Sequence, residues 1–585
     1  MPLFVAAPLP GLSLCRGANT PIDATVQEPM PHTPPTRDPI TIARRLRDEG
    51  DLQGAMRMLE KMVRLPAHRI AALLDIGALL NTAGNFDQAQ AAYREVLKTD
   101  PDNLAAQLGL ADIQLSLSRT DEAKRLYLDL SVKHPDNADV HLGLGECALQ
   151  TGDTDSADTS LTAANDLRPD DATIEFNLAQ VRQMQNDLVA AESLYLSSLR
   201  RLEPGPTAAT VWNKLGSLYS EQRNWEGAAK AFQNAVDLAP GFVSALNNLG
   251  EVMRELGDLE IAEQLFDQAC KNDPDYVPAH FNRSLLRLLS GNYAEAWPDY
   301  DFRWKVPPLV DDPRTLTPPL WNGEKLAGKS IIVHAEQGIG DTIQFMRFLP
   351  QLVAMGAGAR LALSPRLMHL ASGLDGVTLT PLDTLSNQTA DYHCPLMSVP
   401  GRLGVTLETI PRPAPIPAPS AELRKKWKDR LDRPGRNIGI CWQGNPKAAA
   451  DRGRSPPLAA FKPISENPNI SLISLQVSDG LEQLDEVRGQ IDILIQNSDF
   501  DAGSHAFADT IAVLEQVDLV ITGDTAVAHL AASMGKPTWI ALKHIPDWRW
   551  GLTGEICPWY PAASLFRQPS PGDWDSVFRA MADRL

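Results

Sequence analysis

A turn signature recurs along the first half of the chain at intervals of about 34 residues, and this period constrains the fold more than any other feature. The turns carry a glycine or an asparagine, at Gly50, Gly84, Gly152, Asn186, Asn224, Gly257 and Gly291. Ser118 replaces the glycine in one unit without a change of register, and the interval from Asp187 to Asn224 lengthens to 37 residues because residues 203–207 are added. A second marker agrees, since prolines close successive units at Pro101, Pro135, Pro169, Pro240 and Pro274. The period predicts a stack of helical repeats, in which each unit buries its apolar face against the next.

The unit that begins near Ala209 shows how a repeat is built. Its two expected helices carry the pattern residues Trp212, Leu215, Gly216, Tyr219, Ala228, Phe232 and Ala235. The small residues Gly216 and Ala228 let the helices approach closely, and the large residues fill the space between units. This pattern resembles that of tetratricopeptide repeats (TPRs), and we expect about eight of them between residues 39 and 308. Such an array forms a concave surface that usually holds a peptide or protein. Alternatively, the repeats only join copies of the chain or stiffen it.

The charge of the chain narrows the kinds of partner. The formal net charge is −19. From residue 323 onward there are 25 of the 54 Lys and Arg residues and 28 of the 73 Asp and Glu residues, so most of the acidic excess lies in the first 322 residues. Nucleic-acid binding depends on clustered Lys and Arg, so an acidic half argues against a nucleic-acid partner. It suits a polar or basic protein better.

The N-terminus and the cysteines bear on localisation. Residues 1–38 predict a disordered leader, because prolines interrupt its mildly apolar run and no basic segment precedes that run. No apolar stretch approaches the roughly 18 residues that a membrane span needs. The six cysteines stand singly with no C-x-x-C pair, which argues against a zinc site or a disulfide framework. We therefore expect a reducing compartment, the cytoplasm.

The second half of the chain changes from the repeat period to short apolar runs that alternate with helical segments. The runs lie at residues 330–334, 361–364, 377–380, 438–442, 472–476, 519–522 and 538–542. This alternation predicts an α/β domain with parallel sheets. The proline-rich stretch Pro411–Pro419 suggests two lobes, residues 329–420 and 421–585, after a linker at 309–328. Ligands in such sheets bind beyond the carboxyl ends of the strands.

Two strand-to-helix turns carry candidate ligand residues. After the first expected strand, Gly338 and Gly340 allow close backbone approach, and Asp341 stands at the start of a helix. After residues 519–522 comes a turn with Asp524 and Thr525, whose helix N-terminus can hold a phosphate without a metal. Asp524, Thr525 and His529 are the candidate binding residues of this turn for a phosphate-bearing ligand. A histidine at that position is also common in a core.

A third loop, after residues 438–442, carries the cations Lys447, Arg452 and Arg454. Lys447 or Arg454 is a candidate for neutralising a phosphate leaving group. The spacing Asp499-Phe-Asp501 occurs in metal-dependent transferases, but its polar surroundings predict a turn instead. The aromatic residues Trp548, Trp550, Trp559 and Tyr560 are expected in the core.

Together with the D-W-R-W run at 547–550 and the segment 391–400, these loops resemble bacterial TPR glycosyltransferases related to the ADP-heptose:lipopolysaccharide heptosyltransferases. The resemblance covers roughly residues 329–585 and implies a GT-B fold of two Rossmann-like lobes. It also implies metal-independent transfer with no cofactor beyond the nucleotide sugar, and it makes Asp341 the candidate base. Ala526 stands where many relatives have glycine, and the loop around Lys447 differs in length from that of the family.

The same tandem of repeats and GT-B domain is shared with O-linked N-acetylglucosamine transferase and with bacterial flagellin glycosyltransferases. The resemblance therefore implies transfer to a protein Ser or Thr hydroxyl, with the acceptor, flagellin among the candidates, recruited by the repeats. A glycan or lipopolysaccharide acceptor and a non-catalytic scaffold are the alternatives. The donor stays open between a CMP-linked nonulosonic acid, ADP-heptose and UDP-N-acetylglucosamine. Also open are the stereochemical outcome and a homo-oligomer formed through the repeats.

Overall fold

The computed structural model describes residues 38–306, 316–336, 338–432, 435–448 and 451–585. Apart from Asp38, the expected leader lies outside these ranges. The chain divides into two compact units, of which one ends at Ala245 and the other runs from Leu246 to Leu585. None of the helices in the described ranges combines the length and the apolar character that a bilayer crossing requires.

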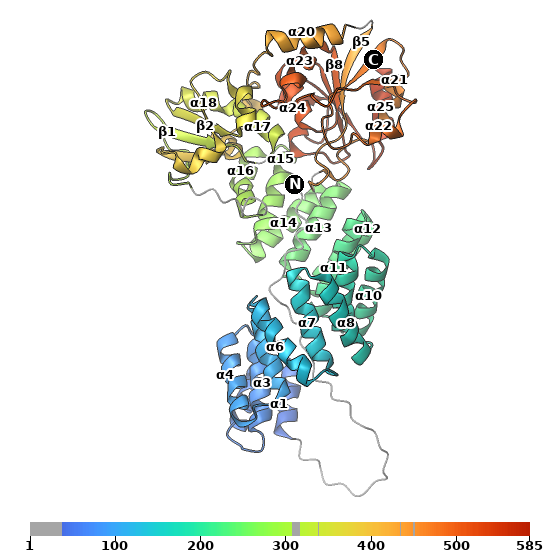
Figure 1. Cartoon of the computed structure of the whole chain (residues 1–585). Coiled ribbons are helices and arrows are strands. Elements are labelled where there is room, and N and C mark those ends of the chain that lie inside the picture. The colour runs from blue at the N-terminus through green and yellow to red at the C-terminus, as the bar shows by residue number, and fades with distance from the viewer. Residues whose placement is uncertain (1–37, 307–315, 337, 433–434, 449–450) are drawn as a thin grey trace. The chain divides into compact units, whose positions relative to one another are not determined.

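Helices alone form the chain from Pro39 to Tyr300, a range that the structure describes without a gap. They are α1 (Pro39–Asp48), α2 (Leu52–Met62), α3 (Arg69–Thr82), α4 (Phe86–Thr99), α5 (Leu104–Ser116), α6 (Thr120–Lys133), α7 (Ala138–Thr151), α8 (Thr154–Leu167), α9 (Ala172–Met184), α10 (Leu188–Arg201), α11 (Pro206–Glu221), α12 (Trp225–Leu238), α13 (Val243–Leu256), α14 (Leu259–Asn272), α15 (Val277–Leu289) and α16 (Tyr293–Tyr300). Two helices for each period of about 34 residues confirm the expected helical repeats (Figure 1).

The turns inside the repeats confirm the register that the sequence predicts. Gly84 and Gly152 adopt φ values of 76° and 74°, in the left-handed region that suits glycine. Ser118 and Asn186 hold the same conformation with φ values of 58° and 62°. The loss of glycine at Ser118 therefore leaves the turn in place.

Glycines inside the helices allow the close packing that the pattern predicts. A Cβ atom on Gly216 of α11 would lie 2.6 Å from the ring of Phe232 on α12. In the other unit, a Cβ atom on Gly250 of α13 would lie 2.6 Å from the ring of Phe266 on α14. Each repeat thus seats a phenylalanine directly on the backbone of its partner helix.

After the repeats, the second unit contains two α/β lobes (Figure 1). The first lobe has a parallel sheet in the order β3-β2-β1-β4. Its strands are β1 (Ser330–His334), β2 (Gly358–Leu363), β3 (Thr378–Pro381) and β4 (Tyr392–Pro395). The helices α17 (Ile339–Phe345) and α18 (Leu349–Ala354) follow β1.

The second lobe has a sheet in the order β10-β11-β9-β8-β5-β6-β7, parallel except for the edge pair β10–β11. The strands are β5 (Arg436–Cys441), β6 (Ile470–Ser474), β7 (Ile493–Leu494), β8 (Leu519–Thr522), β9 (Thr538–Leu542), β10 (Ile556–Cys557) and β11 (Tyr560–Arg567). The helices are α20 (Ala421–Arg430), α21 (Lys462–Ser465), α22 (Gln483–Glu486), α23 (Ala508–Gln516), α24 (Ala526–Ser533) and α25 (Trp574–Asp583).

Apolar residues of the second sheet are buried on both of its faces. Ile438 and Ile521 belong to one buried cluster with Phe578 of α25, whereas Ile473 and Val520 belong to another with residues of α23 and α24. Helices thus cover both faces, as expected for runs of consecutive apolar residues. The predicted class, a helical repeat array followed by an α/β domain of two lobes, is confirmed.

Four strands were not among the expected ones. β4 contains His393 and Pro395 and has no apolar run; the others are β7 and β10, which have two residues each, and β11. The stretch predicted as a linker also differs from a free connection where the structure describes it. Leu320 forms a parallel bridge with His393, and Trp321 is fully buried. The end of this stretch therefore belongs to the first lobe.

The last repeat packs into the same core as both lobes. Trp297 of α16 donates from Nε1 to the carbonyl oxygen of Val405 in the first lobe at 2.8 Å. Trp559 of the second lobe donates from Nε1 to the Tyr293 hydroxyl at 3.0 Å. The ring of Trp548 lies edge-on to Trp297, with centroids 6.1 Å apart. The aromatic residues near the C-terminus are thus buried, as expected, and they share their cluster with the repeats.

Candidate functional site

The glycine turn between β1 and α17 brings the two lobes together. Gly338 precedes α17, and a Cβ atom there would lie 1.9 Å from the Asp341 carboxylate. A Cβ atom on Gly340 would lie 2.8 Å from Cδ2 of His529 on α24. Both glycines therefore satisfy a packing requirement of the protein itself, and Gly340 lets α17 touch a helix of the second lobe.

Asp341 lies in the first turn of α17, where its side chain keeps 28% of its surface exposed. Its carboxylate forms an ion pair with the guanidinium of Arg549, which is buried in the second lobe. The Arg549 guanidinium also donates from Nη1 to Asp547 at 2.7 Å and from Nε to Gln344 at 2.6 Å. Asp547 and Gln344 thus orient the arginine, and the arginine orients Asp341.

Burial and charge oppose each other in this cluster. Burial lowers the pKa of Arg549, but the carboxylates of Asp341 and Asp547 outweigh burial and raise it well above its ordinary value. Burial likewise raises the pKa of Asp547, and the neighbouring Arg549 charge outweighs that effect and lowers it. The pair is therefore fully ionised at neutral pH. The ion pair between Asp341 and Arg549 joins residues 208 positions apart, so local sequence patterns do not reveal it.

The turn between β8 and α24 presents the expected helix N-terminus. The Thr525 hydroxyl lies 2.9 Å from that of Thr522 and does not cap the helix. Asp524 is buried, and Oδ2 lies 3.8 Å from Nη1 of Arg454. Burial raises the pKa of Asp524 against the lowering effect of Arg454.

The loop after β5 separates its candidate cations. Arg454 is partly buried, and Nη2 lies 3.4 Å from Oδ1 of Asp451 in addition to its contact with Asp524. Lys447 is exposed on the same loop. Of these two candidate cations, the structure therefore brings Arg454 to the β8–α24 turn.

His529 lies buried between aromatic side chains of the second lobe. Its ring stacks on Trp550 with centroids 5.2 Å apart, and Nδ1 lies 2.9 Å from the Tyr560 hydroxyl. Burial lowers its pKa to about 3, with Arg549 as the next largest cause, so the ring is neutral. His529 therefore forms part of the packing surface that meets Gly340. Its donor-binding role stays a prediction, and as a neutral ring it would act by a hydrogen bond rather than by charge.

The arrangement places a carboxylate and a phosphate-compatible helix end on two helices that contact each other, α17 and α24. A carboxylate can accept a proton from an attacking hydroxyl. A helix N-terminus together with a cation can stabilise a leaving phosphate. Among the residues that the structure describes, no three His, Cys, Asp or Glu side chains gather as a metal site would require.

Comparison with protein families divides the chain in the same way. Residues 80–133, 111–157, 213–277 and 254–301 match tetratricopeptide repeat families. Residues 482–542 match glycosyltransferase family 9 (heptosyltransferase). The second match contains Asp524, Thr525 and His529.

Individual relatives show which parts are shared. Protein FlbA of Caulobacter vibrioides is 26% identical over 430 residues, which cover 69% of this chain and 71% of that protein. Photosystem I assembly protein Ycf3 of Cyanophora paradoxa is 31% identical over 121 residues, which cover 19% of this chain and 65% of that protein. Among solved structures, a chain of the APC/C hetero-tetramer Cut9-Hcn1 aligns with a TM-score of 0.40 at 16% identity, over 47% of this chain and 54% of that one.

Proposed function

We propose that this glycosyltransferase, in which TPR repeats precede a glycosyltransferase family 9 domain, transfers a sugar from a nucleotide-sugar donor to a protein Ser or Thr hydroxyl. The observation that carries the proposal is the packing of the last repeat on both lobes. Trp297 is hydrogen-bonded to Val405 of the first lobe, and Tyr293 is hydrogen-bonded to Trp559 of the second. A polypeptide bound near this end of the repeats would lie close to the domain that holds Asp341.

The proposed reaction assigns one task to each lobe. The acceptor hydroxyl transfers its proton to Asp341 while its oxygen attacks the anomeric carbon, and the bond from that carbon to the donor phosphate oxygen breaks. Arg549 orients the Asp341 carboxylate for this step. The departing phosphate binds at the start of α24, near Thr525, and Arg454 balances its charge. Lys447 remains a candidate for a second phosphate contact from its exposed position.

The identity of the donor and acceptor is a further part of the proposal. The family resemblance suggests flagellin as an acceptor, and it leaves a CMP-linked nonulosonic acid, ADP-heptose and UDP-N-acetylglucosamine as candidate donors. We place the reaction in the cytoplasm. The five cysteines that the structure describes are free and buried, which suits a reducing compartment.

The test compares three forms of the full-length chain in its native cell: the wild type, Asp341→Asn and the matched control Asp383→Asn. Asp383 is an exposed carboxylate of the same lobe, in the 3-10 turn Leu382–Asn387 that follows β3. Intact-mass analysis of cellular proteins should show a sugar on the acceptor in the wild type and in the control, and none in Asp341→Asn. Binding of the nucleotide sugar should survive in all three forms, because Asp341 lies outside the proposed phosphate site.

The same experiment separates the alternatives. The description of family 9 as heptosyltransferase favours a glycan or lipopolysaccharide acceptor as the second candidate. In that case, the Asp341→Asn strain would keep its protein masses and lose a sugar from its lipopolysaccharide. Unchanged proteins and glycans in that strain would instead indicate a non-catalytic scaffold.

A further inference from the structure

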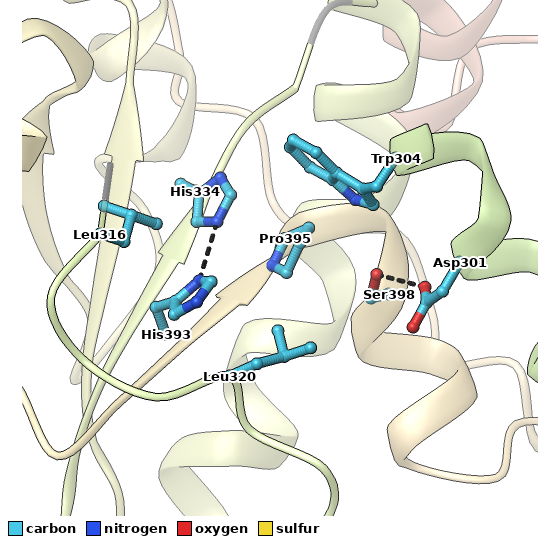
Figure 2. A pocket seen from close by; sticks show the side chains of 8 residues that line it. All are labelled: Asp301, Trp304, Leu316, Leu320, His334, His393, Pro395 and Ser398. Atoms are coloured by element: carbon cyan, nitrogen blue, oxygen red, sulfur yellow. Dashed lines mark hydrogen bonds between the residues drawn. The ribbon is translucent and has the colours of Figure 1, made fainter. Parts of the chain in front are cut away.

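A pocket lies in the first lobe where the chain leaves the last repeat (Figure 2). Its cavity volume is about 350 Å³. The lining residues come from four segments: the 3-10 turn Asp301–Lys305 after α16, residues 316–320, the carboxyl end of β1, and β4 with the turn that follows it. They are Asp301, Trp304, Leu316, Leu320, His334, His393, Pro395 and Ser398. All of them belong to the compact unit that runs from Leu246 to Leu585.

Rings and aliphatic side chains form most of the pocket wall. His334 and His393 lie nearly parallel, with centroids 5.5 Å apart and Nε2 of the first 3.3 Å from Nδ1 of the second. Trp304 meets His334 edge-on at a centroid distance of 5.9 Å. In the view of Figure 2, Leu316 lies on the other side of His334 from Trp304, and Leu320 lies below Pro395. A further aromatic ring inserted here would meet edges and faces of rings, which is the arrangement that aromatic pairs prefer.

The charges beside the pocket are already balanced within the protein. The Asp301 carboxylate accepts from Ser398 Oγ at 2.6 Å and from Arg303 Nη1 at 2.9 Å, and it also pairs with Arg402. Burial lowers the pKa of His393, which keeps that ring uncharged at neutral pH. The Asp301 carboxylate is thus already paired and the His393 ring is uncharged, so the chemistry of the pocket favours an uncharged ligand.

The position of the pocket connects it with the site above. It opens at the carboxyl ends of parallel strands, the edge at which such sheets bind ligands. His334 ends β1, and the loop that begins there leads to Asp341. One wall, Asp301 and Trp304, directly follows the last repeat helix. A polypeptide bound at the last repeat and reaching Asp341 would have this pocket within its reach.

We propose that this pocket binds an uncharged aromatic side chain of the acceptor polypeptide, a short distance in sequence from the Ser or Thr that receives the sugar. This inference rests on the proposed function and adds a specificity subsite to it. The acceptor is then selected by an aromatic residue as well as by its contacts with the repeats.

A binding experiment on the full-length protein tests the pocket without any donor. N-acetyl-phenylalaninamide is the probe, N-acetyl-asparaginamide is the polar control, and ligand-observed NMR is the readout. Leu320→Trp fills the pocket. The control Met355→Trp introduces the same side chain on the same lobe, outside the pocket, at a residue that is 38% exposed where Leu320 is 37% exposed. The wild type and Met355→Trp should bind the phenylalanine probe, and Leu320→Trp should bind it at least about tenfold more weakly. Equal binding by all three proteins, or no binding by the wild type, would overturn the proposal.

A kinetic experiment tests the role in transfer. Leu320→Trp should raise KM for the protein acceptor by about tenfold or more, whereas the control Met355→Trp should leave both this KM and the rate of donor hydrolysis in the absence of acceptor unchanged. Replacement of the acceptor's aromatic residue by alanine should weaken the wild type by a similar factor and add little to the Leu320→Trp effect. If the wild type transfers sugar to no protein, the proposed function itself fails. If it transfers to protein and Leu320→Trp has an unchanged KM, only the pocket assignment fails.

Discussion

The repeats before Ala245 and the last repeat follow one sequence pattern but bury it against different partners. In the first unit, each apolar cluster draws its residues from neighbouring repeats, as in the cluster of Phe176, Tyr195, Val211 and Leu215. In the second unit, Tyr293 and Trp297 of α16 belong to one cluster with the cores of both lobes. The period specifies how the two helices of a repeat pack against each other. The aromatic residues of the last pair determine that this pair also packs against the two lobes.

This difference gives the two regions different mechanical independence. Units that contact only their neighbours gain and lose stability one repeat at a time. A helix pair whose rings fill the core of another domain has no such independence, because its removal exposes that core to water. The boundary between repeat and transferase is therefore a boundary in sequence and not in packing.

The largest expected effect comes from cutting the chain on either side of the last repeats. A fragment of residues 241–585 should fold, whereas a fragment of residues 316–585 should be insoluble or unfolded, because Trp548 and Trp559 would lose their cover. Removing one large buried aromatic residue typically costs about 3–5 kcal/mol, so loss of Tyr293, Trp297 and Tyr300 together rivals the whole stability of a domain. Size-exclusion chromatography and circular dichroism distinguish the outcomes. A well-folded 316–585 fragment would show that the two lobes do not need the last repeat for their stability.

Next in size is the contrast between two buried aromatic residues, each on the second helix of its repeat, tested in the full-length chain. Trp297→Ala should destabilise the transferase by about 3–5 kcal/mol and lower the temperature at which donor hydrolysis is lost. Phe232→Ala should cost a similar amount within the first unit and leave donor hydrolysis unaffected. Differential scanning calorimetry, together with hydrolysis measured after heating, separates the two transitions. Equal loss of hydrolysis in both variants would contradict the proposed difference.

The ion pairs of the two regions offer a third comparison. Arg303, just after the last repeat, is buried and binds Glu336 through Nη2 at 2.7 Å. Its replacement by Met leaves a buried carboxylate without its cation, which typically costs about 3–5 kcal/mol, offset in part by the apolar replacement. Arg182 in the first unit pairs with Asp158 at 2.8 Å with both side chains partly exposed, so Arg182→Met should cost only about 0.2–1 kcal/mol. Denaturant titration measures the loss of unfolding free energy in each variant. Comparable losses would mean that the Arg303 pair contributes no more than an ordinary surface pair.

The sequence predicts the features that depend on neighbours along the chain. The repeat register, including the turn at Ser118, follows from local spacing, and the apolar runs locate β1, β8 and β9 because buried parallel strands need consecutive apolar residues. The pairing of Asp341 with Arg549 does not follow, since it depends on how two lobes meet. For the same reason, a helical position alone did not show that Trp550 and Tyr560 enclose His529. The sequence predicts a linker for the segment that bridges β4, because His393 and Pro395 interrupt the apolar run that would indicate a strand beside it.

The smallest expected effect is a dependence on acid that belongs to the transferase and not to the first repeats. Burial holds the pKa of His529 at about 3 in the folded protein, below its ordinary value of about 6.5 in the unfolded chain. The unfolded state therefore binds the extra proton, so this stabilisation is complete above pH 6.5 and falls as the pH drops. By pH 5.5 the loss amounts to about 1.4 kcal/mol. Asp524, whose pKa burial raises, acts in the opposite direction, so the effect has to be taken as a difference between variants.

The test replaces His529 by Phe, which keeps a ring against Trp550 and removes the titration. The unfolding free energy of the transferase should then change less between pH 6.5 and 5.5 than it does in the wild type. His141→Phe in the first unit is the control, which should leave that transition as steep in pH as before. If His529→Phe keeps the pH dependence of the wild type, another group titrates. His529 would then not be the source of the acid sensitivity.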